Sequence, residues 1–248
     1  MKRIYPTILA AVLAFPLAPA LTRAQGTGEG FFFKEPVATW ALRAGFDHAN
    51  ARSDIFSFTS RELTVDRGDF SGFTIASDVN FRVSPRLGVV LGASYSGSST
   101  PSEFRDFVGE DDLPIEQTTS FKRVPITASL KAYLTPRGRS VGSFAWIPTK
   151  VAPYLGAGGG AMWYRFRQNG EFVDPETLDV FRDTFNSSGW TPEAHAMAGV
   201  DLSLSPRLVL TGEGRYTYAK AKLKEDFVNF DRIDLSGFAV TAGLAIRF

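Results

Sequence analysis

The end of the chain alternates strictly between apolar side chains and small or polar ones. Residues 235–248 have the sequence LSGFAVTAGLAIRF, and the positions of one parity are Phe238, Val240, Ala242, Leu244, Ile246 and Phe248. Alternation with a period of two predicts a β-strand with one apolar face. The segment is also long enough to cross a bilayer's hydrocarbon layer as a tilted strand, which takes roughly 9–11 residues. We therefore expect an amphipathic strand at the end of the chain.

Seven earlier segments show the same alternation. They predict strands at residues 37–47, 70–83, 87–96, 121–134, 150–166, 190–204 and 208–218. Long polar stretches are typical of surface loops, and four of them separate the strands, at residues 48–69, 97–119, 167–189 and 220–233. Between these loops, the Ser-Pro-Arg sequences at 84–86 and 205–207 predict tight turns. We therefore expect antiparallel strands with their long loops on one side.

The first residues have the features of a secretory signal peptide. Met1 to Arg3 is basic, residues 4–21 are apolar, and Thr22 and Ala24 are small residues at the positions that a signal peptidase recognises. We expect residues 1–24 to be removed by cleavage after Ala24, with Ala20 as an alternative. Residues 25–36 would then form an N-terminal leader and residues 37–248 a single domain that contains all the predicted strands, the β-barrel domain.

Composition excludes several classes of protein. The chain has 27 basic and 26 acidic residues, and removal of Lys2, Arg3 and Arg23 leaves 24 basic ones and a net charge of −2. A nucleic-acid-binding protein would be strongly basic, so we expect no nucleic acid partner. After residue 24 no apolar run approaches the roughly 18–20 residues of a membrane helix. If the mature chain lies in a membrane, it must form a closed β-barrel.

Two segments resemble sequences of small outer-membrane β-barrel proteins of the OmpA/OmpW/OmpX-like type. One is the C-terminal assembly motif of that class, which is matched by Thr241, Gly243, Ile246 and Phe248, although an aromatic residue is more usual at Ile246. The other is the Pro-Tyr-x-Gly-Ala-Gly run at 153–158. The resemblance implies an all-β fold, an eight-stranded antiparallel up-and-down transmembrane β-barrel in a Gram-negative-type outer membrane. It also implies the barrel-assembly machinery as a partner.

The distribution of charge indicates which face of such a barrel meets lipid. The apolar faces have almost no ionisable side chains, and a Lys or Arg there would cost roughly 2–4 kcal/mol near mid-bilayer. Aromatic residues gather near strand ends, as in an interfacial girdle. The other faces hold charges of both signs, which can neutralise each other inside a narrow tube. We expect a polar network in the lumen formed by Arg43, Asp78, Arg82, Lys131, Glu193, His195, Asp201, Glu213, Arg215 and Arg247.

The connection at residues 135–149 is longer than this scheme expects. It lies between two strands on the side where the other connections are tight turns. It contains the apolar residues Val141, Phe144, Trp146 and Ile147. We expect it to pack against the mouth of the barrel or against a partner.

Motifs for catalysis, phosphate binding or metal binding are absent from the sequence. We therefore predict no catalytic, cofactor-binding or metal-binding residue. Outer-membrane lipid A deacylases use an outward-facing His with a Ser two residues later, and here the corresponding position after His195 is Met197 and after His48 is Asn50. Two further possibilities stay open, a palmitoyltransferase-like site at His48, Ser53 and Asp54 and Ca²⁺ binding by the acidic loop around 174–183.

Eight strands leave an interior just wide enough for side chains. This favours a structural or surface-interaction role, carried by four extracellular loops with an unknown ligand, rather than bulk diffusion. We expect a monomer that is not an enzyme, surrounded by the outer-membrane lipid bilayer. Two alternatives remain, a narrow channel for small or apolar solutes and a lipid-modifying outer-membrane enzyme.

Overall fold

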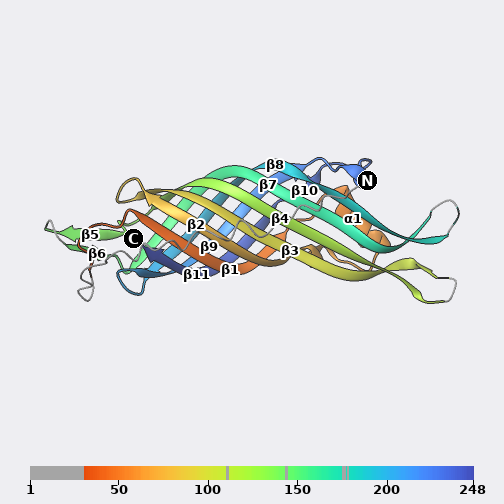
Figure 1. Ribbon diagram of the computed structural model, residues 1–248, viewed down its shortest axis with the longest axis horizontal. Coiled ribbons are helices and arrows are strands. Elements are labelled where there is room, and N and C mark those ends of the chain that lie inside the picture. The colour runs from red at the N-terminus through yellow and green to blue at the C-terminus, as the bar shows by residue number, and fades with distance from the viewer. Residues whose placement is uncertain (1–30, 110–111, 143–144, 175–176, 178) are drawn as a thin grey trace, which may run out of the picture.

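The computed structural model describes residues 31–109, 112–142, 145–174, 177 and 179–248. The predicted signal peptide and its cleavage site lie outside these residues. No helix in the described part of the chain has the length and hydropathy of a membrane span. The described residues form mostly long antiparallel strands, which Figure 1 shows as one elongated barrel.

Eight strands pair in a closed ring. Its order is β1-β2-β3-β4-β7-β8-β9-β11, and β11 pairs with β1 to close it. The ring strands are β1 (Ala38–Ala49), β2 (Gly72–Arg82), β3 (Leu87–Val108), β4 (Pro114–Tyr133), β7 (Val151–Val173), β8 (Val180–Ser203), β9 (Leu208–Ala221) and β11 (Gly237–Arg247). The smaller elements are α1 (Asp54–Glu62), η1 (Arg67–Phe70), β5 (Gly138–Val141), β6 (Ala145–Pro148), η2 (Glu225–Phe227) and β10 (Ile233–Asp234). The predicted eight-stranded antiparallel barrel is confirmed.

The seam between the two ends of the chain closes the barrel. β11 pairs with β1 from Thr39↔Arg247 to Ala49↔Gly237. The last carbonyl, of Phe248, accepts the N–H groups of Val37 and Ala38 at 3.0 Å each. A closed ring pairs the backbone groups that an open sheet would leave free at its edges, which is what a lipid environment requires.

The apolar faces of the strands point outward. Leu130 is 64% exposed, whereas the next residue, Lys131, is 5% exposed. Near the seam, Leu244 is 50% exposed and Arg247 is 5% exposed. The outer surface is therefore a broad apolar belt, and the interior is polar over the same length.

The two Ser-Pro-Arg turns have the same geometry. The hydroxyls of Ser84 and Ser205 accept the N–H groups of Leu87 and Leu208 at 3.1 and 3.0 Å. Each hydroxyl thus satisfies a backbone donor at the start of the following strand. The tight turns predicted from the sequence are present.

Two of the four loop predictions are wrong, because strands continue through most of these residues. β3 and β4 extend through most of residues 97–119, and β7 and β8 extend through most of residues 167–189. These segments are polar, but cross-strand pairs such as Glu171 with Arg182, 3.0 Å apart, stabilise a ladder in water as well as in lipid. They form two hairpins that project beyond the rest of the barrel (Figure 1).

Loops cover the edges of these taller strands. On the β3 side, the N–H of Thr64 donates to the carbonyl of Glu103 at 2.9 Å. On the β8 side, the N–H of Asn186 donates to a carboxylate oxygen of Asp226 at 2.8 Å. The first and fourth of the long connections thus occupy hydrogen-bonding groups that an edge strand would otherwise expose.

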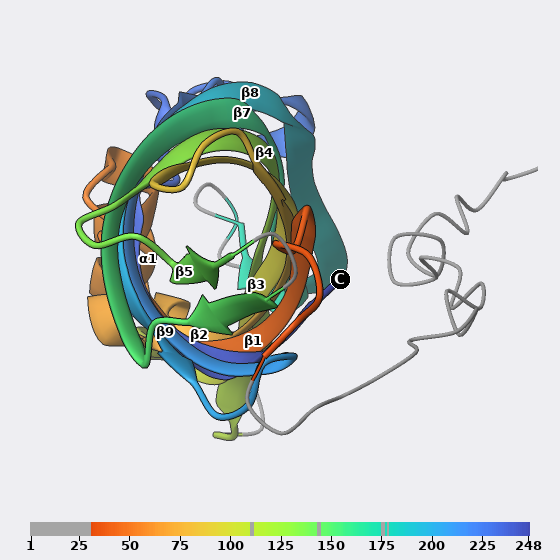
Figure 2. The same ribbon diagram turned by 90° about the vertical axis from the view of Figure 1, so that its left-hand side faces the viewer.

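The connection at 135–149 folds back as the β5–β6 hairpin. Figure 2 looks into this end of the barrel and shows β5 lying across the opening. Trp146 in β6 is 2% exposed, and its backbone pairs with Phe32 of the N-terminal leader. The hairpin therefore packs against the barrel mouth, one of the two placements expected; Phe144 lies outside the described residues.

Candidate functional site

The lumen is filled by side chains that point inward from alternate strand positions. Toward the β5–β6 end, Asp201 Oδ2 lies 3.3 Å from Lys131 Nζ and accepts the Tyr133 hydroxyl at 2.8 Å. Asp201 Oδ1 accepts the Thr211 hydroxyl at 2.8 Å. Lys131 Nζ also lies 3.5 Å from the centre of the Tyr154 ring. The buried carboxylate of Asp201 on β8 therefore links side chains of β4 to one of β9.

A second group of charges lies around Arg43 of β1. The guanidinium lies 2.7 Å from Asp78 and 3.2 Å from Glu213. Glu213 also pairs with Arg215 at 3.0 Å and accepts the Tyr154 hydroxyl at 3.0 Å. The group contains two cations and two carboxylates, so its formal charges balance inside the barrel.

A third group surrounds His195 of β8. Its Nε2 lies 2.8 Å from Ser129 Oγ, and its Nδ1 lies 3.1 Å from a carboxylate oxygen of Glu193. The His195 and Glu193 side chains are 0% and 1% exposed. Serine hydrolases use this order of groups, but a nucleophile also needs room for its substrate. We interpret these three buried, hydrogen-bonded side chains as a structural link between β4 and β8.

This interpretation gives an expected result with a fluorophosphonate probe. The folded wild-type protein in detergent should form no adduct at Ser129, because the hydroxyl is already engaged inside a closed barrel. Intact-mass measurement would detect the adduct, and a serine hydrolase in the same detergent is the positive control. Stoichiometric labelling that Ser129→Ala abolishes would contradict the structural role.

Two residues predicted for the network lie nearer the barrel mouth and have other partners. Arg82 pairs with Glu35 of the N-terminal leader at 3.1 Å. Arg247 donates to Ser203 Oγ at 2.9 Å, and its guanidinium lies 5.5 Å from the centre of the Trp146 ring. Arg82 therefore continues the inward parity of β2 at the barrel mouth, and it does not contact the Arg43 group. Its partner comes from a segment outside the predicted barrel domain.

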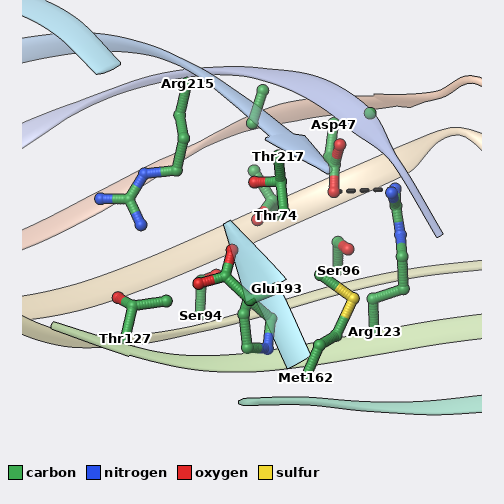
Figure 3. A pocket seen from close by; sticks show the side chains of 13 residues that line it. Asp47, Thr74, Ser94, Ser96, Arg123, Thr127, Met162, Glu193, Arg215 and Thr217 are labelled. Atoms are coloured by element: carbon green, nitrogen blue, oxygen red, sulfur yellow. Dashed lines mark ion pairs between the residues drawn. The ribbon is translucent and has the colours of Figure 1, made fainter. Parts of the chain in front are cut away.

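An ion pair that the predicted network did not include crosses the lumen close to Glu193, the partner of His195. Asp47 of β1 lies 2.8 Å from Arg123 of β4. Figure 3 shows this pair on one side of a cavity that Glu193 and Arg215 also line. The cavity measures about 30 Å³, which is room for about two water molecules.

A cluster of aromatic and aliphatic side chains closes the end of the barrel from which the two long hairpins project. Phe56 of α1 is 0% exposed, and its ring centre lies 4.6 Å from that of Phe70, 5.3 Å from Phe121 and 5.8 Å from Phe166. Phe121 and Phe166 point inward from β4 and β7. The wider core adds residues of the first and fourth loops, among them Ile55, Leu63, Val65, Leu223, Phe227, Ile233 and Leu235.

The sequence does not predict this closure, because residues 48–69 have the composition of a polar loop. The structure instead places α1 there, with Ile55, Phe56 and Thr59 buried on one side. The sequence did contain a signal for the closure. In β7 the outward side chains are apolar up to Trp163, whereas beyond Trp163 the apolar side chains, Tyr164 and Phe166, are on the inward face. Inward aromatic residues need an apolar partner, and the first loop provides it.

The chain resembles solved outer-membrane proteins in structure rather than in sequence. By sequence, no protein-family model and no curated protein matches the chain. By structure, a major outer membrane protein from Thermus thermophilus matches 85% of this chain and 99% of its own, with 14% identity and a TM-score of 0.47. Neisserial surface protein A matches 85% and 96%, with 16% identity and a TM-score of 0.45. OprG from Pseudomonas aeruginosa matches 88% and 99%, with 15% identity and a TM-score of 0.45.

The decisive feature is the chain's own geometry, a closed antiparallel ring with an apolar outer belt and a polar interior. That combination suits lipid outside and ion pairs inside. The chain has an outer-membrane β-barrel fold. An outer-membrane location follows from this architecture, in which outward apolar residues such as Leu130 and Leu244 meet lipid.

The open possibility of a palmitoyltransferase-like site in this β-barrel gains no support from the positions of its residues. His48 Nδ1 lies 3.1 Å from Ser71 Oγ. Ser53 and Asp54 instead accept backbone N–H groups of the fourth loop at 3.1 and 2.8 Å. Among the described residues, no group of three or more His, Cys, Asp or Glu side chains is placed to hold a metal ion.

The residues of the predicted assembly motif lie on both faces of β11. Thr241 is buried on the inward side, whereas Ile246 and Phe248 are exposed on the outward side. Gly243 faces inward at the seam, where an added Cβ would contact the carbonyl of Leu42. The glycine thus permits close approach of β11 to β1. Recognition of the motif by the assembly machinery stays a prediction.

Proposed function

We propose that this outer-membrane β-barrel acts as a closed support for its extracellular hairpins, which carry a surface-interaction role. The observation that carries the proposal is the obstruction of the lumen. Trp146 covers one mouth, the Arg43 group fills the centre, and the Phe56 cluster fills the other end. The barrel would be a monomer delivered through its C-terminal motif to the barrel-assembly machinery.

The hairpins have the composition of an interaction surface. Near their tips, Phe107, Val108, Val180 and Phe181 are exposed among acidic residues. These segments project beyond the apolar belt, so lipid does not account for the exposure. Exposed apolar side chains grouped on a surface are typical of binding sites. This supports an extracellular ligand that the two hairpins contact.

The proposal gives two expected results. Wild-type barrel in planar bilayers should show no single-channel conductance, because side chains block the lumen at three levels. On arrays of glycans and extracellular-matrix proteins, wild type should bind at least one component. Shortening both hairpins to Gly-Ser turns, by removing 104–113 and 172–181, should abolish that binding and keep the heat-modifiable migration of a folded barrel. Steady conductance, or equal array binding without hairpins, would contradict the proposal.

Neither alternative function gains support from the lumen. A narrow channel for small or apolar solutes needs a continuous path, and the cavity in Figure 3 holds about two waters. A lipid-modifying enzyme needs a reactive group that lipid can reach, and the His195 side chain is fully buried. Unchanged lipid A mass after incubation with the refolded barrel would count against the enzyme.

A further inference from the structure

The outward side chains of β4 and β7 change from apolar to charged at the hairpin-side edge of the apolar belt. The outward positions change from Val124 to Lys122 in β4 and from Trp163 to Arg165 in β7. In the same step the inward position of β4 changes from Arg123 to Phe121. Charged side chains and interfacial Trp residues are typical of the level where hydrocarbon ends and lipid headgroups begin. This level of the barrel therefore faces headgroups.

Three cations are adjacent at this level. In the register of β4 and β7, Lys122 lies opposite Arg165, and Ser120 lies opposite Arg167. Residues opposite each other in an antiparallel pair point to the same face, with Cβ atoms about 4.5–5.5 Å apart. Lys122, Arg165 and Arg167 therefore form one outward-facing group, which we call the basic cluster.

Among the side chains that the structure describes, no carboxylate forms an ion pair with the basic cluster. Within the described parts of the chain, the ion pairs involve other basic residues, and none includes Lys122, Arg165 or Arg167. The Arg165 guanidinium lies 5.1 Å from the centre of the Trp163 ring, and its Nε is buried without a hydrogen-bond partner. Like charges opposite each other on a sheet destabilise it. An anion bound between these cations would therefore relieve their mutual repulsion.

We propose that the basic cluster binds the phosphate group of a phosphorylated outer-leaflet glycolipid. A phosphate offers several oxygens to Lys and Arg donors, and Arg can bind it through two parallel hydrogen bonds. The acyl chains of the lipid would lie along the belt directly below, where Trp190 is 59% exposed opposite Trp163. This apolar surface next to the cations favours a lipid over free phosphate. The inference rests on the proposed outer-membrane role.

The test measures lipid retained by the refolded full-length barrel in neutral detergent. Native mass spectrometry would compare lipid A carrying two phosphates with the same lipid A after phosphatase treatment. EDTA is present throughout, so that a divalent cation cannot bridge phosphate to the acidic hairpins. Wild type should bind the phosphorylated form about 150-fold more tightly, because each of the three cations should contribute about fivefold near an anionic group. The double variant Lys122→Ser/Arg165→Ser should lose most of this preference.

The matched control removes the same charge elsewhere. Arg86→Ser/Arg207→Ser changes two exposed cations in the Ser-Pro-Arg turns at the opposite end, and it should keep the wild-type preference. An equal loss in this control, or equal binding of both lipids by wild type, would overturn the inference. Displacement of the lipid by inorganic phosphate at equal concentration would also overturn it, because the site would then be specific for free phosphate.

Heat-modifiable migration of every sample separates this inference from the proposed function. Wild type that never gains the folded form in detergent or vesicles would contradict the membrane barrel itself. A folded barrel without preference for phosphorylated lipid would contradict only the basic cluster's role. If the double variant does not fold, Lys122→Ser/Arg167→Ser replaces it, with the same expected loss of preference.

Discussion

Replacing Arg43 by Met should lower the free energy of unfolding by about 3–5 kcal/mol, because it leaves buried carboxylates without their cation. Arg43 is 3% exposed and pairs with both Asp78 and Glu213. Arg215 would still neutralise Glu213, so Asp78 would be the main uncompensated charge. Urea unfolding of the barrel in lipid vesicles, followed by Trp fluorescence and by heat-modifiable migration, would measure the loss.

Two further variants show whether the loss is electrostatic. Arg86→Met changes an exposed cation in a turn and should alter the free energy of unfolding by less than about 0.5 kcal/mol. The double change Arg43→Met/Asp78→Asn removes the stranded charge, leaves the Glu213–Arg215 pair intact, and should recover much of the lost stability. A double variant less stable than Arg43→Met would mean that the side chains matter through shape rather than charge.

Replacing Phe56 by Ala should detach the first extracellular loop from the barrel. Phe56 is fully buried among Phe70, Phe121 and Phe166, and truncation of a buried Phe typically costs about 3–5 kcal/mol. The transmembrane ladders do not depend on this contact, so the cost should fall on the loop. Limited proteolysis of the folded barrel should then cut within residues 50–70, where wild type resists.

Phe58 provides the matched control for Phe56. It lies two residues away on α1, is 40% exposed, and its ring centre lies 5.4 Å from that of Phe230. Phe58→Ala should therefore change proteolysis of the loop only slightly. Equal cleavage in both variants, or resistance in Phe56→Ala, would show that the aromatic cluster does not hold the loop.

The sidedness of the strands could be predicted from sequence because alternation is a local property. In β4, Leu130 and Lys131 must point to opposite faces whatever the strand pairs with. Once the barrel is closed, charge cannot remain on the lipid side. The C-terminal strand could be placed for the same reason, and the two tight turns could be placed because the Ser-Pro-Arg sequence is also a local signal.

The hairpin end of the barrel was harder to predict because its polar composition fits both a solvated loop and a paired strand. Polar residues such as Asn169 and Thr184 occur equally in a solvated loop and in a ladder with water on its outer face. β7 and β8 stay paired there because each ladder continues from a rigid base in the membrane. Similarly, Phe121 is unremarkable in the sequence until the first loop returns to pack against it.

The sequence by itself determined an eight-stranded barrel, its lipid-facing side and most of the charged side chains in the middle of its lumen. Only the tertiary structure decided which charges pair. Arg43 meets Glu213, and Asp47 meets Arg123, across strands that are not neighbours in the ring. Such pairs depend on strand order, register and the curvature of the closed barrel. These are properties of the whole ring, whereas alternation is fixed within each strand.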